Sequence, residues 1–280
     1  MRLREALKDV LDAGELEMLS GGFDIVGDIA ILEIPEELRA KETEIAQAVL
    51  GMHRNVRTVV AKGTPFEGEL RTRTVRHLAG EKKTATLHRE SGAVIEVDIE
   101  RMYFSPRLSH ERLRIASLVK EGERVLVMFS GCGPYPLVIA KNSKAKEVVG
   151  VELNEAAHEY ALRNITKNKL QERVRCFQGD ARAVVPELKP KKFDRVVMPH
   201  PEGGEYFLDI ALGAVKKKGT VHFYDFLNES DIPQAALDKV ISACNKAKGK
   251  IKPKPTILGH VVCGQIGCRT YRVCVDFTIN

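Results

Sequence analysis

The 280-residue sequence contains no tryptophan, few aromatic residues and no apolar run as long as a membrane helix requires. Its first five residues alternate charged and apolar side chains, unlike the apolar stretch and small-residue cleavage site of a secretory signal. The six cysteines are scattered over both halves, mostly in apolar segments, which favours buried, reduced thiols over a disulfide framework. These absences exclude a membrane protein and a disulfide-rich secreted domain. They predict a soluble, cytoplasmic protein.

The formal net charge of +6 is compatible with a polyanionic partner but is weak evidence alone. Basic residues gather in two short stretches, one with Arg71, Arg73, Arg76 and His77, the other with Arg107, Arg112 and Arg114. Such clusters predict phosphate contacts, with a solvated charged face as the equally acceptable alternative.

The length exceeds the ~100–200 residues of a usual domain, which predicts one large domain and one smaller domain. Residues 1–110 have the pattern of a mixed α+β unit. We expect helices near residues 2–12 and 42–52, strands near 28–34 and 58–60, and a hairpin of 84–88 with 94–99 around the turn Glu90–Gly92.

Residues 111–280 alternate strands, loops and helices, as parallel α/β domains do. The expected strands lie near 124–129, 147–152, 174–178, 193–198 and 219–226, and the expected helices near 154–168, 203–215 and 232–247. Two last strands, near 259–265 and 270–279, are close enough in sequence to be antiparallel neighbours.

A glycine turn, Ser130–Tyr135, directly follows the apolar segment 124–129. Glycines at the carboxyl edge of a parallel sheet allow the backbone to approach a bound nucleotide. Pro134, and the absence of a third glycine, argue against the pyrophosphate loop of a dinucleotide site.

Two acidic residues follow the next two strands. Glu152 ends the segment 147–152 about twenty residues after the turn, where an acid can accept hydrogen bonds from ribose hydroxyls. Asn154 is placed to cap the next helix, and Asp180 follows the third strand, where it could meet an adenine amino group. This order predicts a nucleoside cofactor, and the missing phosphate-binding pattern favours S-adenosyl-L-methionine over NAD or ATP.

With these residues the chain resembles the archaeal and eukaryotic tRNA (guanine37-N1)-methyltransferases of the Trm5 type. The resemblance runs along nearly the whole chain and is most specific in the segments Arg76–Glu81, Thr86–His88, Tyr103–Leu108, Glu111–Arg112, Phe129–Pro134 and Ala161–Leu170, together with Gly92 and Asp98.

The resemblance implies an α/β fold. A class I (Rossmann-like) methyltransferase domain, residues 111–280, would follow a small α+β RNA-positioning domain, residues 1–110. The implied reaction methylates N1 of guanosine 37 in the anticodon stem-loop of tRNA, with neither DNA nor a membrane as partner. Arg71 would contact the guanine O6, Tyr103 would support the flipped base, and Glu111 would be the general base. These roles suit the chemistry, since N1 must lose its proton while negative charge builds on O6.

The resemblance also implies a set of cofactor-binding residues and no metal. They are Arg107, Phe129, Gly131, Gly133, Pro134, Glu152, Asp180 and Pro199. The chain departs from the family in having Val127 where an acid is usual, and Pro199–Pro201 in place of Asn-Leu-Pro, so that His200 could replace the amide that reads the guanine edge. Family members also commonly carry an N-terminal domain that grips the outer corner of tRNA, and this sequence begins after it.

Several alternatives remain at this point. Related wybutosine-pathway enzymes transfer an aminocarboxypropyl group, or methylate a wyosine precursor, at the same tRNA position; Arg107, the segment His77–Glu81 and Gly133–Pro134 fit guanosine methylation better than aminocarboxypropyl transfer. A relative that binds RNA without catalysis is the third alternative. Without the resemblance, Glu111 is a surface residue at the start of a helix. His260, Cys263, Cys268 and Cys274 lack the spacing of a zinc knuckle and are predicted to be ordinary thiols and an ordinary histidine.

Overall fold

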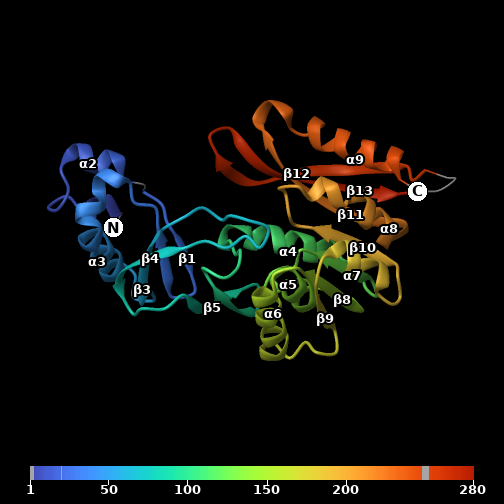
Figure 1. Cartoon of the computed structure of the whole chain (residues 1–280), viewed down its shortest axis with the longest axis horizontal. Coiled ribbons are helices and arrows are strands. Elements are labelled where there is room, and N and C mark those ends of the chain that lie inside the picture. The colour runs from blue at the N-terminus through green and yellow to red at the C-terminus, as the bar shows by residue number, and fades with distance from the viewer. Residues whose placement is uncertain (1–2, 20, 248–251) are drawn as a thin grey trace. The chain divides into compact units, whose positions relative to one another are not determined.

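The computed structural model describes residues 3–19, 21–247 and 252–280 (Figure 1). Contacts along the chain divide it into two compact units. Unit 1 comprises Met1–Arg89 and Val94–Arg107, and unit 2 comprises Glu90–Ala93 and Leu108–Asn280. No helix among the described residues is long and apolar enough to cross a membrane.

Unit 1 is built on a four-stranded sheet with the order β1-β2-β3-β4. The strands are β1 (Asp24–Val26), β2 (Ile29–Leu32), β3 (Thr58–Lys62) and β4 (Val75–Gly80); β2 and β3 are parallel and the outer pairs are antiparallel. Its helical segments are α1 (Leu3–Ala6), α2 (Ala13–Met18), η1 (Glu36–Lys41) and α3 (Glu42–Met52). Leu38, Ile45 and Val49 pack against Ala30 and Val59 of the sheet in one apolar core.

The prediction of one helix near residues 2–12 is wrong in its length. Residue 2 lies outside the described residues. α1 ends at Ala6, and a second helix begins after Asp12. The Asp12 side chain accepts a hydrogen bond from Glu15 N at 2.9 Å, while the Glu15 carboxylate accepts one from Asp12 N at 2.9 Å. This reciprocal capping box starts a new helix and thereby interrupts the predicted one.

The predicted hairpin is confirmed as the two-stranded sheet of β5 (Ala85–Glu90) and β6 (Ala93–Asp98). Its two turn residues, Ser91 and Gly92, have φ angles of 45° and 76°. Two consecutive left-handed residues match the right-handed twist of the strands that they join. Strands β1 and β4 were not predicted, because β1 is very short and β4 lacks a clear alternation of apolar and polar side chains.

Unit 2 contains, among its described residues, a seven-stranded sheet with the order β12-β13-β11-β10-β7-β8-β9. These strands are β7 (Arg124–Met128), β8 (Glu147–Glu152), β9 (Val174–Gln178), β10 (Phe193–Met198), β11 (Val215–Asn228), β12 (Pro255–Gly267) and β13 (Thr270–Ile279). β9, β8, β7, β10 and β11 are mutually parallel, and β13 and β12 continue the sheet antiparallel. The predicted α/β class and the antiparallel last pair are confirmed.

Helices cover both faces of this sheet (Figure 1). They are α4 (Ser109–Leu118, after the short η2, Pro106–Leu108), α5 (Pro134–Asn142), α6 (Glu155–Lys167), α7 (Ala181–Glu187), α8 (Leu208–Ala214, after η3, Gly204–Phe207) and α9 (Gln234–Lys246, after η4, Glu229–Asp231). α7, α8 and α9 share one apolar core with the sheet, while α5 and α6 contact β8 and β9 and α4 packs on α5. The single helix predicted at 203–215 is wrong in part, since a 3-10 segment occupies its first turn, preceded by Gly203 with φ 79°.

A buried ion pair fixes the start of α4. The Arg112 guanidinium donates through Nε and Nη2 to the two carboxylate oxygens of Glu90, both at 2.5 Å, and the two side chains are 2% and 4% exposed. The phosphate contact predicted for Arg112 is therefore wrong, because its charge is already paired away from solvent. In the same predicted clusters, Arg76 binds Glu42 and Arg107 binds Asp24.

We predict that Glu90→Ala will lower the free energy of unfolding by about 3–5 kcal/mol, because it leaves the Arg112 charge buried without a partner. The measurement is urea-induced unfolding of the full chain. Glu121→Ala is the matched control, since Glu121 pairs with Lys144 at 3.2 Å with both side chains more than three-quarters exposed; it should change stability by less than about 1 kcal/mol. Equal losses in the two variants would contradict a special role for the buried pair.

Candidate functional site

The turn after β7 has an unusual backbone. Phe129, Gly131 and Gly133 all have positive φ angles, 58°, 56° and 90°. Such angles are easy for glycine but strained for phenylalanine, and strain of this kind concentrates at functional sites. Gly133 is the N-cap of α5 and Pro134 occupies its first turn, where a missing N–H has no cost. The turn therefore brings the β7 backbone to the amino end of a helix.

The carboxylate of Glu152, at the end of β8, holds this turn. Its Oε2 accepts a hydrogen bond from Gly131 N at 2.7 Å, and its Oε1 accepts one from Asn154 N at 2.8 Å. Burial raises the pKa of Glu152 above its ordinary value, and the backbone N–H groups oppose this shift. One carboxylate thus joins the ends of two neighbouring strands.

Further hydrogen bonds fix the same edge of the sheet. Ser130 N donates to Val151 O at 2.9 Å, and Gly179 N donates to Glu152 O at 2.8 Å, so the ends of β7, β8 and β9 are connected. From α6, the fully buried Asn164 donates through Nδ2 to Cys132 O at 3.0 Å. Asn164 belongs to the segment Ala161–Leu170 that carried part of the resemblance, but its anchoring role was not predicted.

Asp180 and an aromatic group lie beyond the turn. Asp180 is the N-cap of α7, accepts from Arg182 N at 2.8 Å and keeps 46% of its side chain exposed. The Phe129 ring lies 5.0 Å from the His200 ring and 4.9 Å from the Phe207 ring, measured between centroids. His200 follows Pro199 in the loop after β10, so this loop borders the glycine turn.

Glu111 lies in the first turn of α4, as its alternative interpretation expects, but it is 5% exposed and so is not a surface residue. Arg114 donates to both of its oxygens, from Nε to Oε2 at 2.7 Å and from Nη2 to Oε1 at 2.8 Å. The Tyr224 hydroxyl also donates to Oε1, and the Tyr135 hydroxyl donates to Tyr224 at 3.2 Å. The Glu111 carboxylate is therefore held directly by one guanidinium and one hydroxyl.

The Arg114 guanidinium reaches a second buried acid. Its Nη1 donates to Asp276 Oδ2 at 2.7 Å, and His222 Nδ1 lies 2.6 Å from Asp276 Oδ1. The other ring nitrogen of His222 lies 2.6 Å from Arg195 Nη1, and Arg195 is paired with Glu123 at 2.8 Å. Asp276, His222, Arg195 and Glu123 were not predicted as site residues, although a lone acid and a lone histidine within apolar strands are a signal of buried polar partners.

In unit 1, the structure brings together two of the three predicted catalytic residues. The Arg71 guanidinium lies 5.4 Å from the centroid of the Tyr103 ring, and the Phe66 ring meets Tyr103 edge-on at 4.8 Å. Arg71 has a φ of 51°, which marks a strained turn. Arg107, a predicted cofactor-binding residue, is exposed and donates from Nε to Asp24 Oδ1 at 2.6 Å.

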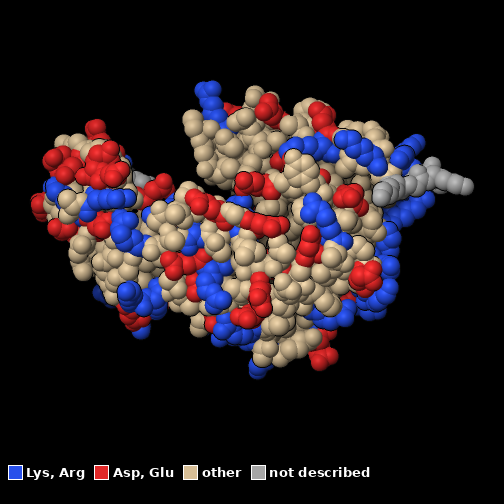
Figure 2. Space-filling model, viewed as in Figure 1, with Lys and Arg blue, Asp and Glu red and all other residues tan. Residues whose placement is uncertain are grey.

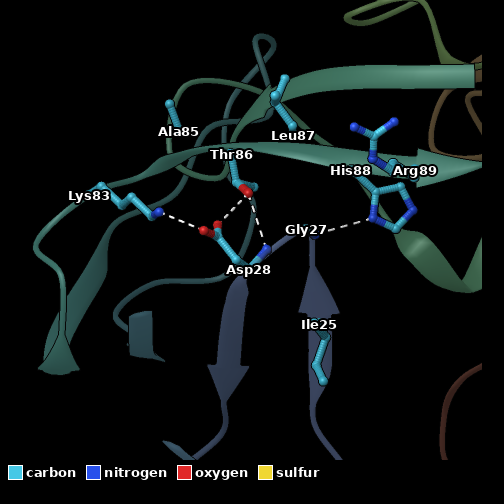
Figure 3. A pocket seen from close by; sticks show the side chains of 9 residues that line it. All are labelled: Ile25, Gly27, Asp28, Lys83, Ala85, Thr86, Leu87, His88 and Arg89. Atoms are coloured by element: carbon cyan, nitrogen blue, oxygen red, sulfur yellow. Dashed lines mark hydrogen bonds and ion pairs between the residues drawn. The ribbon is translucent and has the colours of Figure 1, made fainter. Parts of the chain in front are cut away.

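Unit 1 also has an open pocket of about 630 Å³ (Figure 3). Its polar groups bind one another: Asp28 accepts from Lys83 at 2.7 Å and from Thr86 Oγ1 at 2.6 Å, and the backbone N–H of Gly27 donates to His88 Nδ1 at 3.3 Å. A Cβ on Gly27 would lie 2.1 Å from Thr86 Oγ1, so this turn requires glycine. These bonds fasten the β1–β2 turn to β5.

Three potential metal ligands, His222, Cys274 and Asp276, come together among the described residues, with their ligand atoms within 4.8 Å of one another. His260 and Cys268 of the tail are not part of this group. The ligand atoms of His222 and Asp276 already bind each other, and the positive Arg114 and Arg195 flank them, which disfavours a cation. All six cysteines are described and free; Cys132, Cys244 and Cys274 are buried as predicted, whereas Cys268 is exposed.

On the face that Figure 2 draws, basic and acidic side chains are intermingled, with acidic ones among the lysines and arginines.

Comparison with protein families gives two matches. Residues 86–252 match the TRM5/TYW2 methyltransferase domain, and residues 3–84 match the TYW2 N-terminal domain. The first match alone covers more than half of the chain.

Three relatives carry different names. The tRNA (guanine(37)-N(1))-methyltransferase Trm5b of Pyrococcus abyssi is 38% identical, over 94% of this chain and 76% of its own. The tRNA 4-demethylwyosine(37)-methyltransferase Taw21 of Saccharolobus solfataricus is 33% identical, over 92% and 93%. A tRNA(Phe) (4-demethylwyosine(37)-C(7)) aminocarboxypropyltransferase of Methanocaldococcus jannaschii is 32% identical, over 77% and 82%.

Solved structures agree with this grouping. Trm5b from Pyrococcus abyssi superposes with a TM-score of 0.87 at 36% identity, covering 98% of this chain and 80% of its own. A structure of aTrm5 in complex with tRNALeu superposes with a TM-score of 0.86 at 30% identity, covering 100% and 78%. The predicted Rossmann-like methyltransferase fold and the predicted resemblance are thus confirmed, and the chain belongs to the TRM5/TYW2 methyltransferase family.

Proposed function

We propose that this protein transfers a methyl group from S-adenosyl-L-methionine to N1 of guanosine 37 of tRNA, in the cytoplasm. The observation that supports the proposal most strongly is the 38% sequence identity with Trm5b of Pyrococcus abyssi over 94% of the chain. The resemblance assigns the catalytic roles to Glu111, Arg71 and Tyr103, and these roles suit the chemistry.

The carboxyl edge of the unit 2 sheet suits S-adenosyl-L-methionine. The turn at Gly131 and Gly133 allows a close approach of the backbone, and Pro134, with no third glycine after it, disfavours a dinucleotide pyrophosphate at this turn. Glu152 and Asp180 would accept hydrogen bonds from the ribose hydroxyls and the adenine amino group, with Phe129, Pro134 and Pro199 as apolar contacts. When bound, the cofactor supplies an electrophilic methyl group on a good leaving group.

Proton removal is the task of the protein. Guanine N1 carries a proton and becomes a nucleophile only as that proton leaves, so a carboxylate must accept it. In the proposal, an oxygen of Glu111 takes the N1 proton while the Arg71 guanidinium offsets the negative charge on O6. Tyr103 would stack on the base once it has left its helix stack.

Two related reactions compete with this proposal, because enzymes named for each are similar to this chain. Aminocarboxypropyl transfer breaks a different bond of the same cofactor, and methylation of 4-demethylwyosine uses a different base. Gly133–Pro134 and Arg107 favour methyl transfer over aminocarboxypropyl transfer. The choice between guanosine and the wyosine precursor requires the assay below.

We predict that purified protein and S-adenosyl-L-methionine will convert an unmodified tRNA transcript with guanosine 37 to the N1-methylguanosine form. Nucleoside mass spectrometry is the measurement. The same transcript with adenosine 37 is the control and should give no product. If only tRNA that carries 4-demethylwyosine gives a product, that base and not guanosine is the substrate. If none of these tRNAs accepts a methyl group, the proposal is wrong.

We predict that Glu152→Gln will weaken binding of S-adenosyl-L-methionine by about 10-fold or more, as measured by titration calorimetry. An amide offers only one acceptor, so one of the N–H groups of Gly131 and Asn154 would face an NH₂ group and the turn would shift. Glu147→Gln is the matched control, because Glu147 begins the same strand and pairs with Arg124 and Arg175. Equal affinity of both variants and the parent protein would contradict the proposed cofactor site.

A further inference from the structure

We propose that Asp276 and His222 are positioning residues for Glu111, acting through Arg114. Neither has a place in the proposed reaction as set out above. The inference rests on that proposed function, because it takes Glu111 as the group that accepts the proton from the base.

The link is one guanidinium that binds two carboxylates. Arg114 uses Nε and Nη2 for Glu111 and Nη1 for Asp276, at 2.7, 2.8 and 2.7 Å. Arg114 and Glu111 lie on α4, whereas Asp276 lies on β13 of the seven-stranded sheet. Because the guanidinium is planar and rigid, binding Asp276 on β13 fixes the orientation in which Arg114 binds Glu111 on α4.

The donor and acceptor groups fix the direction of the two hydrogen bonds that run from Arg195 through His222 to Asp276. An arginine can only donate, so Arg195 Nη1 donates to the lone pair of His222 Nε2, and the His222 proton must be on Nδ1. That N–H donates to Asp276 Oδ1 at 2.6 Å. Burial lowers the pKa of His222, which agrees with a neutral ring. The histidine thus has one tautomer and one orientation.

Asp276 remains ionised in this setting. Burial opposes its charge, but the hydrogen bond from His222 and the ion pair with Arg114 hold its pKa well below the ordinary value. Its side chain is 12% exposed, and that of His222 is 1% exposed. Negative and positive groups therefore alternate from Glu123 through Arg195, Asp276 and Arg114 to Glu111, with the neutral His222 between two of them.

The orientation of Glu111 depends on that of Arg114, because Arg114 binds both of its carboxylate oxygens while the Tyr224 hydroxyl binds only one. Arginine has a long side chain with many rotamers, and a partner on its own helix does not fix it relative to the sheet. A general base must lie within hydrogen-bond reach of its proton, and displacement by about 1 Å can cost about 100-fold in rate. Asp276 removes the freedom of Arg114 and thereby that of Glu111.

The test is single-turnover methyl transfer by the full chain, with tRNA and cofactor saturating. Asp276→Asn keeps the size of the side chain but replaces one acceptor oxygen with an NH₂ group. This NH₂ donor would face either His222 Nδ1–H or the Arg114 guanidinium, which are donors themselves, so one hydrogen bond is lost. We expect about 10- to 100-fold slower transfer, with cofactor and tRNA affinities within about 2-fold of the parent protein. In a Glu111→Gln background, the same change should slow the residual reaction by less than about 2-fold, because its effect passes through Glu111.

Two further variants separate positioning from loss of stability. Asp225→Asn is the matched control: Asp225 is also a buried acid of β11–β13, 2% exposed, and its partner Lys239 lies 2.7 Å away. It should lower stability without changing the single-turnover rate. Arg114→Lys keeps the charge at a partly exposed position, but lysine cannot bind both carboxylates as a planar fork, so transfer should be slower. In the Arg114→Lys background, Asp276→Asn should cause almost no further loss of the single-turnover rate.

The outcomes distinguish this inference from the proposed function. Parent-like transfer by Asp276→Asn, or a rate loss that multiplies with that of Glu111→Gln, would overturn the positioning role while leaving the proposed reaction intact. Undiminished transfer by Glu111→Gln alone would overturn both the base assignment and the positioning role. A protein that transfers no methyl group would overturn the proposed function itself.

Discussion

The arrangement of the candidate site depends on one carboxylate. Glu152 accepts one backbone N–H from the glycine turn after β7 and another from the start of α6, while its own carbonyl accepts one from Gly179 after β9. Three consecutive strand ends are therefore held together by the residue that ends the middle strand. The left-handed backbone at Gly131 and Gly133 follows from this closure, because the chain must turn sharply to bring its N–H groups to the acid.

A second constraint operates within unit 2, where charges are buried in compensated groups. Removing a charged group from water costs several kcal/mol, so each must find an opposite partner with good geometry. Arg112 satisfies this with Glu90, and Arg114 satisfies it with both Glu111 and Asp276. The same arrangement that makes these charges tolerable also fixes the orientation of Glu111. In our account, the stability of this region and the placement of the proposed base have one physical cause.

Much of the unit 2 fold could be predicted because its strands are nearly continuous apolar runs separated by turn residues. The glycine turn and the two acids could be found because their spacing follows directly from consecutive strands and helices. The ion-pair partners of the clustered arginines could not be predicted. Arg112 pairs with Glu90, 22 positions away, and Arg114 pairs with Asp276, 162 positions away, and no local sequence pattern indicates either pair. α5 and α7 were missed, since they are short and lack strong periodicity, and α4 was anticipated only as a helix that would start near Glu111. The capping box at Asp12 was not predicted.

The central claim is that this site transfers the methyl group of S-adenosyl-L-methionine rather than its aminocarboxypropyl group. The most direct test uses cofactor radiolabelled either at the methyl group or at the carboxylate, with guanosine-37 transcript as acceptor. Our account predicts that only the methyl label enters the tRNA. Incorporation of the carboxylate label would contradict it, because that label travels with the aminocarboxypropyl group.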